Sequence, residues 1–176
     1  MQSHADVKRL CTAALLSAMA LALQYLESLL PPLVPGIPVK LGLANLVTLY
    51  TMLRFSRRDA FIVSALRVLL FPLLSGAVSG FFYAAAGTLL SFAVMALLLP
   101  LVRAGRLSPV GQSVAGAFLF HVGQTLVGLL TVGRAMLAYF PYMGLISIPA
   151  GALTGFLAML LAKRLAGARP SASPRS

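Results

Sequence analysis

The sequence predicts an all-α integral membrane protein, a bundle of six transmembrane helices with both termini in the cytoplasm. The chain is 60% hydrophobic and only 10% charged, whereas about a quarter of the residues of a soluble protein are charged. Its apolar residues form continuous runs, which favours helices over the alternating pattern of a β-barrel. The 176 residues leave room for roughly six spans of about 20 residues each, joined by short loops.

Six apolar segments are expected to form the spans. They cover about residues 10–30, 40–53, 60–74, 81–99, 110–132 and 143–161. Pro31 is expected to end the first segment and Pro100 the fourth, because proline interrupts the hydrogen bonding of a helix. Residues 133–142 are aromatic and amphipathic, and we expect them to lie in the membrane interface.

One transmembrane domain, residues 10–162, is expected between two cytoplasmic ends. Residues 1–9 form the short N-terminus, and residues 163–176 form a basic tail that we expect to be disordered. A signal peptide is the alternative for the start, because Lys8 and Arg9 precede an apolar run that contains small residues. The run continues far enough to span a membrane, which favours a retained helix.

The basic residues predict the orientation of the bundle. Two Lys or Arg residues precede the first segment, three follow the second, two follow the fourth and four follow the sixth. With six spans these groups share one side of the membrane, and only Lys40 and Arg134 fall on the other. Cytoplasmic loops carry the excess of basic residues. The net charge of +11 therefore reports topology, and we expect no nucleic-acid partner.

The residue types needed for catalysis are scarce. The sequence contains no aspartate-rich run for Mg²⁺ and diphosphate and no glycine-rich phosphate loop ending in Gly-Lys-Ser/Thr. Cys11 is the only cysteine, and no Cys/His spacing is typical of a metal site. We expect no catalytic residue, no metal and no cofactor.

Glu27 and Lys40 flank a proline-rich loop after the first segment. Glu27 lies about 25 Å along the helix from the start of that segment, close to the outer interface. The two residues either brace the loop as a local ion pair or line an outward-facing cavity.

Arg67 lies near the middle of the third segment, where an unpaired cation costs a few kcal/mol or more. It therefore needs a partner. Asp6 and Asp59 fall at the cytoplasmic ends, so the candidates are Glu27 and a bound anion.

Three further polar residues are candidates for the same site. His121 and Gln124 are three residues apart and share a helix face. Each is expected either to contact a ligand or to form a hydrogen bond within the bundle. Asn45 either lines the cavity or bonds to a neighbouring helix.

Ala14, Ala18 and Ala22 repeat at four-residue spacing in the first segment. Such a face allows another helix to approach closely. The alternative is that alanine is simply common in this segment.

Several motifs together resemble the Gx transporter family, also called heptaprenyl diphosphate synthase component I, a family of bacterial membrane proteins. They are Tyr-Leu-Glu-Ser-Leu-Leu-Pro at 25–31, Pro-Gly-Ile at 35–37, Lys-Leu-Gly-Leu-Ala-Asn-Leu-Val-Thr-Leu at 40–49, Arg-Val-Leu-Leu at 67–70, and Ala-Gly-Ala at 115–117 with His-Val-Gly-Gln at 121–124. The resemblance covers about residues 10–160, and Leu-Gly-Leu-Ala-Asn is its most specific part.

The resemblance implies a likeness to the substrate-binding, or S, components of energy-coupling-factor transporters in the bacterial cytoplasmic membrane. It implies a pocket on the outer side for a small molecule, such as a vitamin, a flavin or a quinone precursor. It also implies that the face formed by Ala14, Ala18 and Ala22 docks on a transmembrane coupling subunit that works with ATPases. Glu27, Lys40, Asn45, Arg67, His121 and Gln124 would line the pocket, and their charge balance favours an anionic substrate. The older family name implies the alternative, a non-catalytic membrane subunit of heptaprenyl diphosphate synthase.

Overall fold

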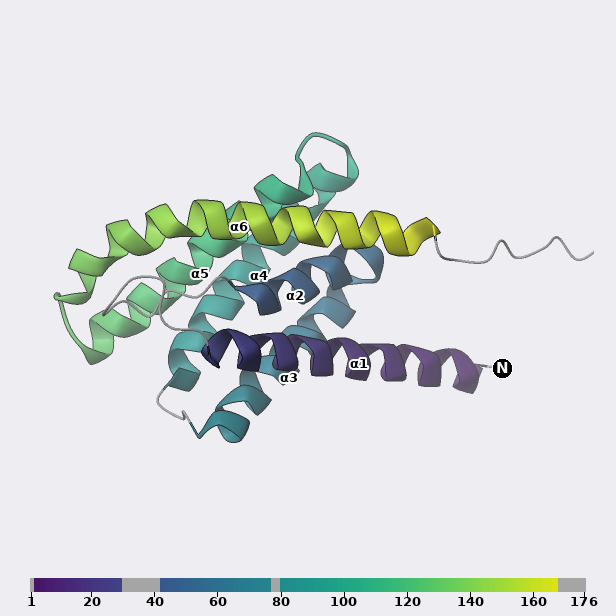
Figure 1. The fold of residues 1–176 in the computed structure, drawn as a ribbon, viewed down its shortest axis with the longest axis horizontal. Helices are drawn as coiled ribbons and strands as arrows, with labels where there is room; N and C mark the ends of the chain where they lie inside the picture. Colours follow the sequence, from purple (N-terminus) through teal and green to yellow (C-terminus); the bar gives the residue numbers. More distant parts are fainter. Residues whose placement is uncertain (1, 30–41, 77–79, 168–176) are drawn as a thin grey trace, which may run out of the picture.

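The structure is a computed structural model, and it describes residues 2–29, 42–76 and 80–167. Six helices make up these ranges (Figure 1). They are α1 (Gln2–Leu29), α2 (Leu43–Arg54), α3 (Arg57–Ser75), α4 (Phe81–Arg103), α5 (Pro109–Thr131) and α6 (Met136–Gly167). The described part of the chain is therefore all-helical, as the sequence predicts.

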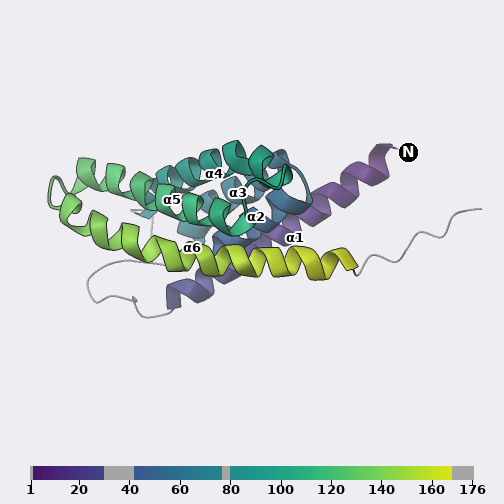
Figure 2. The same ribbon diagram turned by 90° about the horizontal axis from the view of Figure 1, so that it is seen from above.

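The helices form a bundle in which α2 lies between α1 and α6 (Figure 1). On the other side, α5 packs along both α4 and α6. The view from above shows the start of α1 and the end of α6 at the same end of the bundle (Figure 2). An ion pair fixes the turn between α2 and α3 to this end, because Arg9 Nε lies 2.7 Å from Asp59 Oδ1.

In the described part of the chain, four helices are long and apolar enough to cross a membrane. They are α1 from Val7, α4, α5, and α6 up to Leu165. The prediction of an all-α membrane protein is therefore confirmed. The finer prediction of six spans does not follow from length and composition. Helix α2 has 12 residues, or about 18 Å, against a hydrocarbon core of about 30 Å, and α3 includes four charged residues.

Several predicted helix ends are wrong. Helix α4 continues through Pro100 to Arg103, and α6 begins at Met136 and continues through Pro141 and Pro149. Most of the expected interfacial loop, residues 133–142, is therefore helical. Prolines are tolerated inside membrane helices because neighbouring groups satisfy the freed backbone carbonyls. Helix α1 also starts earlier than expected, at Gln2.

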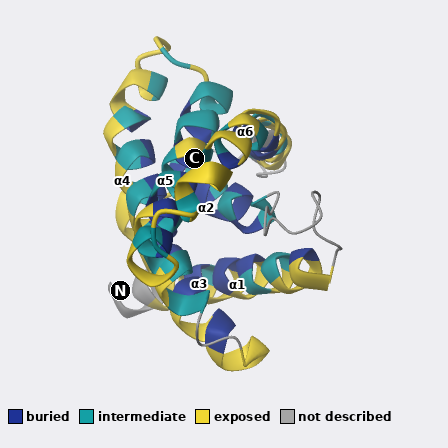
Figure 3. Ribbon diagram, turned by 90° about the vertical axis from the view of Figure 1, so that its left-hand side faces the viewer, coloured by how far each residue is buried: buried dark blue, intermediate teal, exposed yellow. Residues whose placement is uncertain are grey.

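Helix α2 forms the centre of the core. Its buried residues Leu46, Val47, Leu49 and Met52 pack in one cluster. The same cluster includes residues of α1, α3, α4 and α6, namely Leu16, Ala20, Ala60, Val63, Met95, Leu99 and Ala158. Figure 3 shows buried residues turned inward and exposed residues on the outer sides of the helices. The exposed outer surface is rich in leucine and phenylalanine, as expected of helices that face lipid.

Glycines bring α4, α5 and α6 close together. A Cβ atom on Gly123 of α5 would lie 2.6 Å from the carbonyl oxygen of Ala86 in α4. A Cβ atom on Gly151 of α6 would lie 2.7 Å from the Cα atom of Val114 in α5. Only hydrogen fits at such contacts, so these three helices pack as a tight layer.

Candidate functional site

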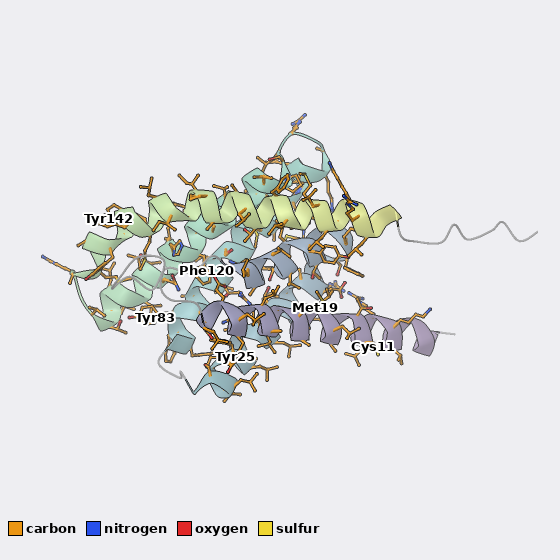
Figure 4. All side chains as sticks on the ribbon, in the orientation of Figure 1. Cys11, Met19, Tyr25, Tyr83, Phe120 and Tyr142 are labelled. Atoms are coloured by element: carbon orange, nitrogen blue, oxygen red, sulfur yellow. The ribbon has the colours of Figure 1, made fainter. Side chains whose placement is uncertain are left out.

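A cavity of about 50 Å³ lies inside the bundle, and its described lining residues come from five helices, α1, α2, α3, α5 and α6, and from Gly42 at the start of α2. The described residues that line it are Gln24, Glu27, Gly42, Asn45, Arg67, Ala117, Phe120, His121 and Ala150. Figure 4 labels Phe120, which lies well inside the outline of the bundle, whereas Tyr83 and Tyr142 lie toward one end. Four of the six predicted site residues, Glu27, Asn45, Arg67 and His121, meet at this cavity.

Glu27 is held by the start of α2. Its side chain is 6% exposed, and its Oε1 accepts a hydrogen bond of 2.5 Å from the backbone N–H of Gly42. Its Oε2 accepts one of 3.2 Å from the N–H of Leu43. A carboxylate is stabilised there because the first N–H groups of a helix lack intrahelical partners and carry partial positive charge. Glu27 therefore fixes the junction between α1 and α2.

Gly42 has a backbone φ of 73°, in the left-handed region where glycine is favoured. This conformation allows the chain to turn into α2 with its N–H directed at the carboxylate. Lys40, the other half of the predicted brace, lies outside the described residues, so its pairing with Glu27 stays a prediction.

Arg67 is a buried cation with neutral hydrogen-bond partners. Its side chain is 5% exposed, and its Nη2 donates to Asn45 Oδ1 at 3.2 Å and to Thr88 Oγ1 at 3.0 Å. Its Nε is buried and has no hydrogen-bond partner. Glu27 lines the same cavity as Arg67. A buried donor without a partner is costly, so the cavity is suited to a group that accepts a hydrogen bond from this nitrogen.

His121 is buried on α5, where its Nδ1 lies 3.1 Å from Oε1 of Gln124. With the amide oxygen as acceptor, Nδ1 carries the proton, and Nε2 is left as an acceptor. Gln124 does not itself line the cavity. Its contact orients the imidazole ring, so the two residues act as one unit.

Sequence reasoning missed Gln24 and Thr88. Gln24 lines the cavity one turn before Glu27, and its buried Oε1 has no hydrogen-bond partner. An amide at that position in an apolar segment was a signal that could have found it. Thr88 contacts Arg67 from α4, but a threonine in a membrane helix commonly bonds its own backbone and gives no comparable signal.

Ala14, Ala18 and Ala22 are all exposed along one side of α1. Ala13, Ser17 and Ala20 form the buried side of the same helix. The predicted small-residue face thus lies on the outside of the bundle. Its role in partner binding stays a prediction.

Comparison with known proteins identifies one family over most of the chain. The family model described as heptaprenyl diphosphate synthase component I matches residues 16–161. No curated protein and no solved structure matches the chain. The matched range includes every described residue that lines the cavity. The chain therefore belongs to the heptaprenyl diphosphate synthase component I family.

Proposed function

We propose that this protein is the substrate-binding membrane component of a small-molecule uptake transporter of the energy-coupling-factor type, and that it binds an anionic molecule in the central cavity. The observation that carries the proposal is Arg67. It is almost fully buried at the cavity, it bonds only to neutral side chains, and its Nε lacks a hydrogen-bond partner. A cation in that setting favours an anionic ligand, because ligand oxygens supply the missing acceptors.

The proposed topology has six crossings of the bacterial cytoplasmic membrane, with both termini in the cytoplasm. Helix α2 is surrounded by other helices, so its crossing needs neither the length nor the apolar surface of a helix that faces lipid. The positive-inside distribution of Lys and Arg supports this orientation. Residues 10–162 would form the transmembrane domain.

The proposed partner surface is the small-residue face of α1. Ala14, Ala18 and Ala22 are exposed there, and small side chains allow a second helix to approach closely. A transmembrane coupling subunit would dock on this face and link the protein to its ATPases.

A second function is favoured by the family description. Component I of heptaprenyl diphosphate synthase implies at least one further component. In this alternative the protein is a non-catalytic membrane subunit that binds a soluble prenyl synthase subunit. The sequence contains no aspartate-rich run that could hold Mg²⁺ and diphosphate for prenyl transfer.

Co-purification separates the two functions. The tagged protein is co-expressed in one arm with a transmembrane coupling subunit and in the other with a soluble prenyl synthase subunit. We expect stable capture of the coupling subunit. We expect Ala18→Leu to weaken that capture because the larger side chain prevents a second helix from approaching closely. Ala93→Leu, at an exposed position of α4, is the matched control and should leave capture unchanged. Capture of the prenyl synthase subunit alone would reject the transport function in favour of the alternative.

A further inference from the structure

A second pocket, of about 410 Å³, lies where α1 begins, between α1 and the turn that joins α2 to α3. Its walls include Lys8, Arg9, Thr12, Leu16, Phe55 and Ser56. Lys8 and Phe55 are exposed, whereas Leu16 is buried, so the pocket opens at the surface and has an apolar floor. It shares no described residue with the central cavity.

The charged and apolar walls of this pocket lie at different depths along α1. The apolar part of α1 that is long enough to cross a membrane begins at Val7, which places Lys8 and Arg9 at the edge of the hydrocarbon layer, beside the lipid head groups. Leu16 lies about 12 Å farther along the helix, at the depth of the acyl chains. The pocket thus presents charge at one depth and apolar side chains below it, in the order in which a phospholipid carries its own groups.

The carboxylate in the pocket wall is already bound within the protein. Asp59 Oδ1 accepts a 2.7 Å hydrogen bond from Arg9 Nε, and Asp59 Oδ2 accepts one of 2.6 Å from Ser56 Oγ. The ammonium group of Lys8, in contrast, forms no ion pair with any residue that the structure describes. Lys8 is therefore the cation of the pocket that is left for an anionic ligand, and an ammonium group binds phosphate well.

The charge around the pocket is basic even when the side chains outside the described set are counted. Residues 6–9 and 54–59 together contain five Lys or Arg residues and two Asp residues. Arg57 and Arg58, in the first turn of α3, are both exposed. Groups of basic residues next to a membrane span attract anionic lipid head groups.

We propose that this pocket binds an anionic phospholipid, with its phosphate at Lys8 and its glycerol backbone and first acyl carbons against Leu16 and Phe55. A cavity of about 150 Å³ holds a benzene molecule, so the pocket has room for a phosphate and the glycerol attached to it. The inference does not depend on the proposed function, because the pocket and the central cavity have separate walls.

The test measures lipid binding to the full-length protein by native mass spectrometry from detergent micelles. Two lipids with the same dioleoyl chains are compared, anionic phosphatidylglycerol and phosphatidylcholine, whose net charge is zero. Glycerol 3-phosphate serves as a head group without chains. We expect phosphatidylglycerol to bind at least fivefold more tightly than phosphatidylcholine and at least tenfold more tightly than glycerol 3-phosphate. Equal affinities for the two lipids would overturn the inference. Equal affinity for glycerol 3-phosphate would also overturn it, in favour of a soluble phosphate compound.

A charge variant tests the position of the phosphate. We expect Lys8→Gln to lower the affinity for phosphatidylglycerol about fivefold, the contribution of roughly one basic residue beside an anionic surface, and to leave the affinity for phosphatidylcholine unchanged. Arg106→Gln removes one positive charge at an exposed position outside the pocket and should change neither affinity. Equal losses in the two variants would show that the net charge of the protein, and not this pocket, attracts the lipid.

A steric variant tests the pocket without changing its charge. Thr12→Phe places a ring in the pocket, and we expect it to lower the affinity for phosphatidylglycerol at least fivefold. Cys11→Phe places the same ring at the exposed neighbouring position outside the pocket and should leave that affinity unchanged. Melting temperatures show that both variants are folded. An unchanged affinity of folded Thr12→Phe would overturn the inference.

A protein partner is the remaining occupant to distinguish. The pull-down with the coupling subunit and the prenyl synthase subunit is repeated with Lys8→Gln and Thr12→Phe. If these variants lose capture of either subunit while they bind phosphatidylglycerol as the unmodified protein does, the pocket is a protein-docking surface and the lipid inference is rejected. The proposed anion site at Arg67 is unaffected by that result.

Discussion

The carboxylate of Glu27, near the end of α1, accepts a 2.5 Å hydrogen bond from the backbone N–H of Gly42, fifteen residues later in the chain. This contact places the negative charge at the positive end of α2. Glu27 is therefore both a wall of the cavity and the cap of the helix that fills the centre of the core.

Replacing Glu27 should test the capping role. We expect Glu27→Ala to lower the free energy of unfolding by about 1.5–3 kcal/mol, because hydrogen bonds from the first N–H groups of α2 to a charged acceptor are lost. Glu27→Gln keeps an acceptor oxygen and should lose less. Thermal melts in detergent measure both, with Ser28→Ala as the exposed neighbouring control. Unchanged stability of Glu27→Ala would contradict capping.

Arg67→Met should separate binding from stability. Removing a buried guanidinium that has an unmet donor is expected to leave the ligand-free protein at least as stable, because a buried charge is costly to desolvate. Binding of an anionic probe such as acetate should be lost. Arg134→Met, at an exposed position, is the control.

The alternative for Arg67 is a structural pair with Glu27. In that case each single variant should lose about 3–5 kcal/mol, and the double variant should recover much of the loss. Comparison of the melting temperatures of the two single variants and the double variant decides between the two roles.

Gln124 should affect ligand affinity indirectly, by orienting the ring of His121. Its Oε1 accepts the Nδ1 hydrogen bond of the imidazole, so Gln124→Ala leaves the ring free to turn. We expect ligand affinity to fall about 2- to 10-fold, the equivalent of one hydrogen bond of about 0.5–1.5 kcal/mol, and to fall further with His121→Ala. The double variant should be no weaker than His121→Ala alone. Additive losses would mean that Gln124 contacts the ligand independently.

Lowering the pH should reduce the stability that Asp59 contributes at the turn between α2 and α3. Burial raises the pKa of Asp59, but hydrogen bonds from Arg9 and Ser56 and the charge of Arg9 lower it more, so the net pKa lies below the ordinary value of 3.8. The carboxylate therefore stabilises the fold above that ordinary value, and this contribution is lost as the pH falls through the lowered pKa.

Melting temperatures from about pH 6 down to about pH 2 should show this loss. Asp59→Asn should flatten the dependence, whereas Glu27→Gln should retain the part that belongs to Asp59. An unchanged acid response in Asp59→Asn would show that the Arg9 contact does not contribute.

Cysteine accessibility should report the topology. In a Cys11→Ser background, Arg57→Cys and Ala104→Cys should be labelled only from the cytoplasm, and Ala138→Cys only from outside. All three positions are exposed, so a missing label would reflect sidedness. Labelling of position 138 from the cytoplasm would reject the proposed six-crossing arrangement.

The sequence was a good guide to which polar residues lie together inside the bundle. Glu27, Asn45, Arg67 and His121 stand out because polar groups are expensive inside a membrane and so gather where they can be satisfied. Their meeting at one cavity could be expected on that ground alone. The cap on α2 could not, because it depends on a backbone turn at Gly42 that brings two distant segments together.

The helix ends were predicted less well, for a physical reason. Pro100 was expected to end the fourth segment, and residues 133–142 were expected to form an interfacial piece before the sixth. Pro100 and most of residues 133–142 lie inside helices, since a membrane offers the chain no water to satisfy an open loop. Thr88 could not be identified from the sequence, because a threonine in a helix commonly bonds to its own backbone. The hydroxyls of Thr51 and Thr125 do so here. Nothing local distinguishes the one that reaches Arg67.

The close contacts at Gly123 and Gly151 leave little room for α4, α5 and α6 to shift against one another. The cavity takes one wall from that layer, at His121 and Ala150, and the opposite wall from α1, α2 and α3. A molecule held between the two walls contacts both groups of helices, so its binding free energy also stabilises their packing against each other. Substitutions far from the cavity that weaken the packing between these two groups of helices will therefore weaken binding without touching the ligand.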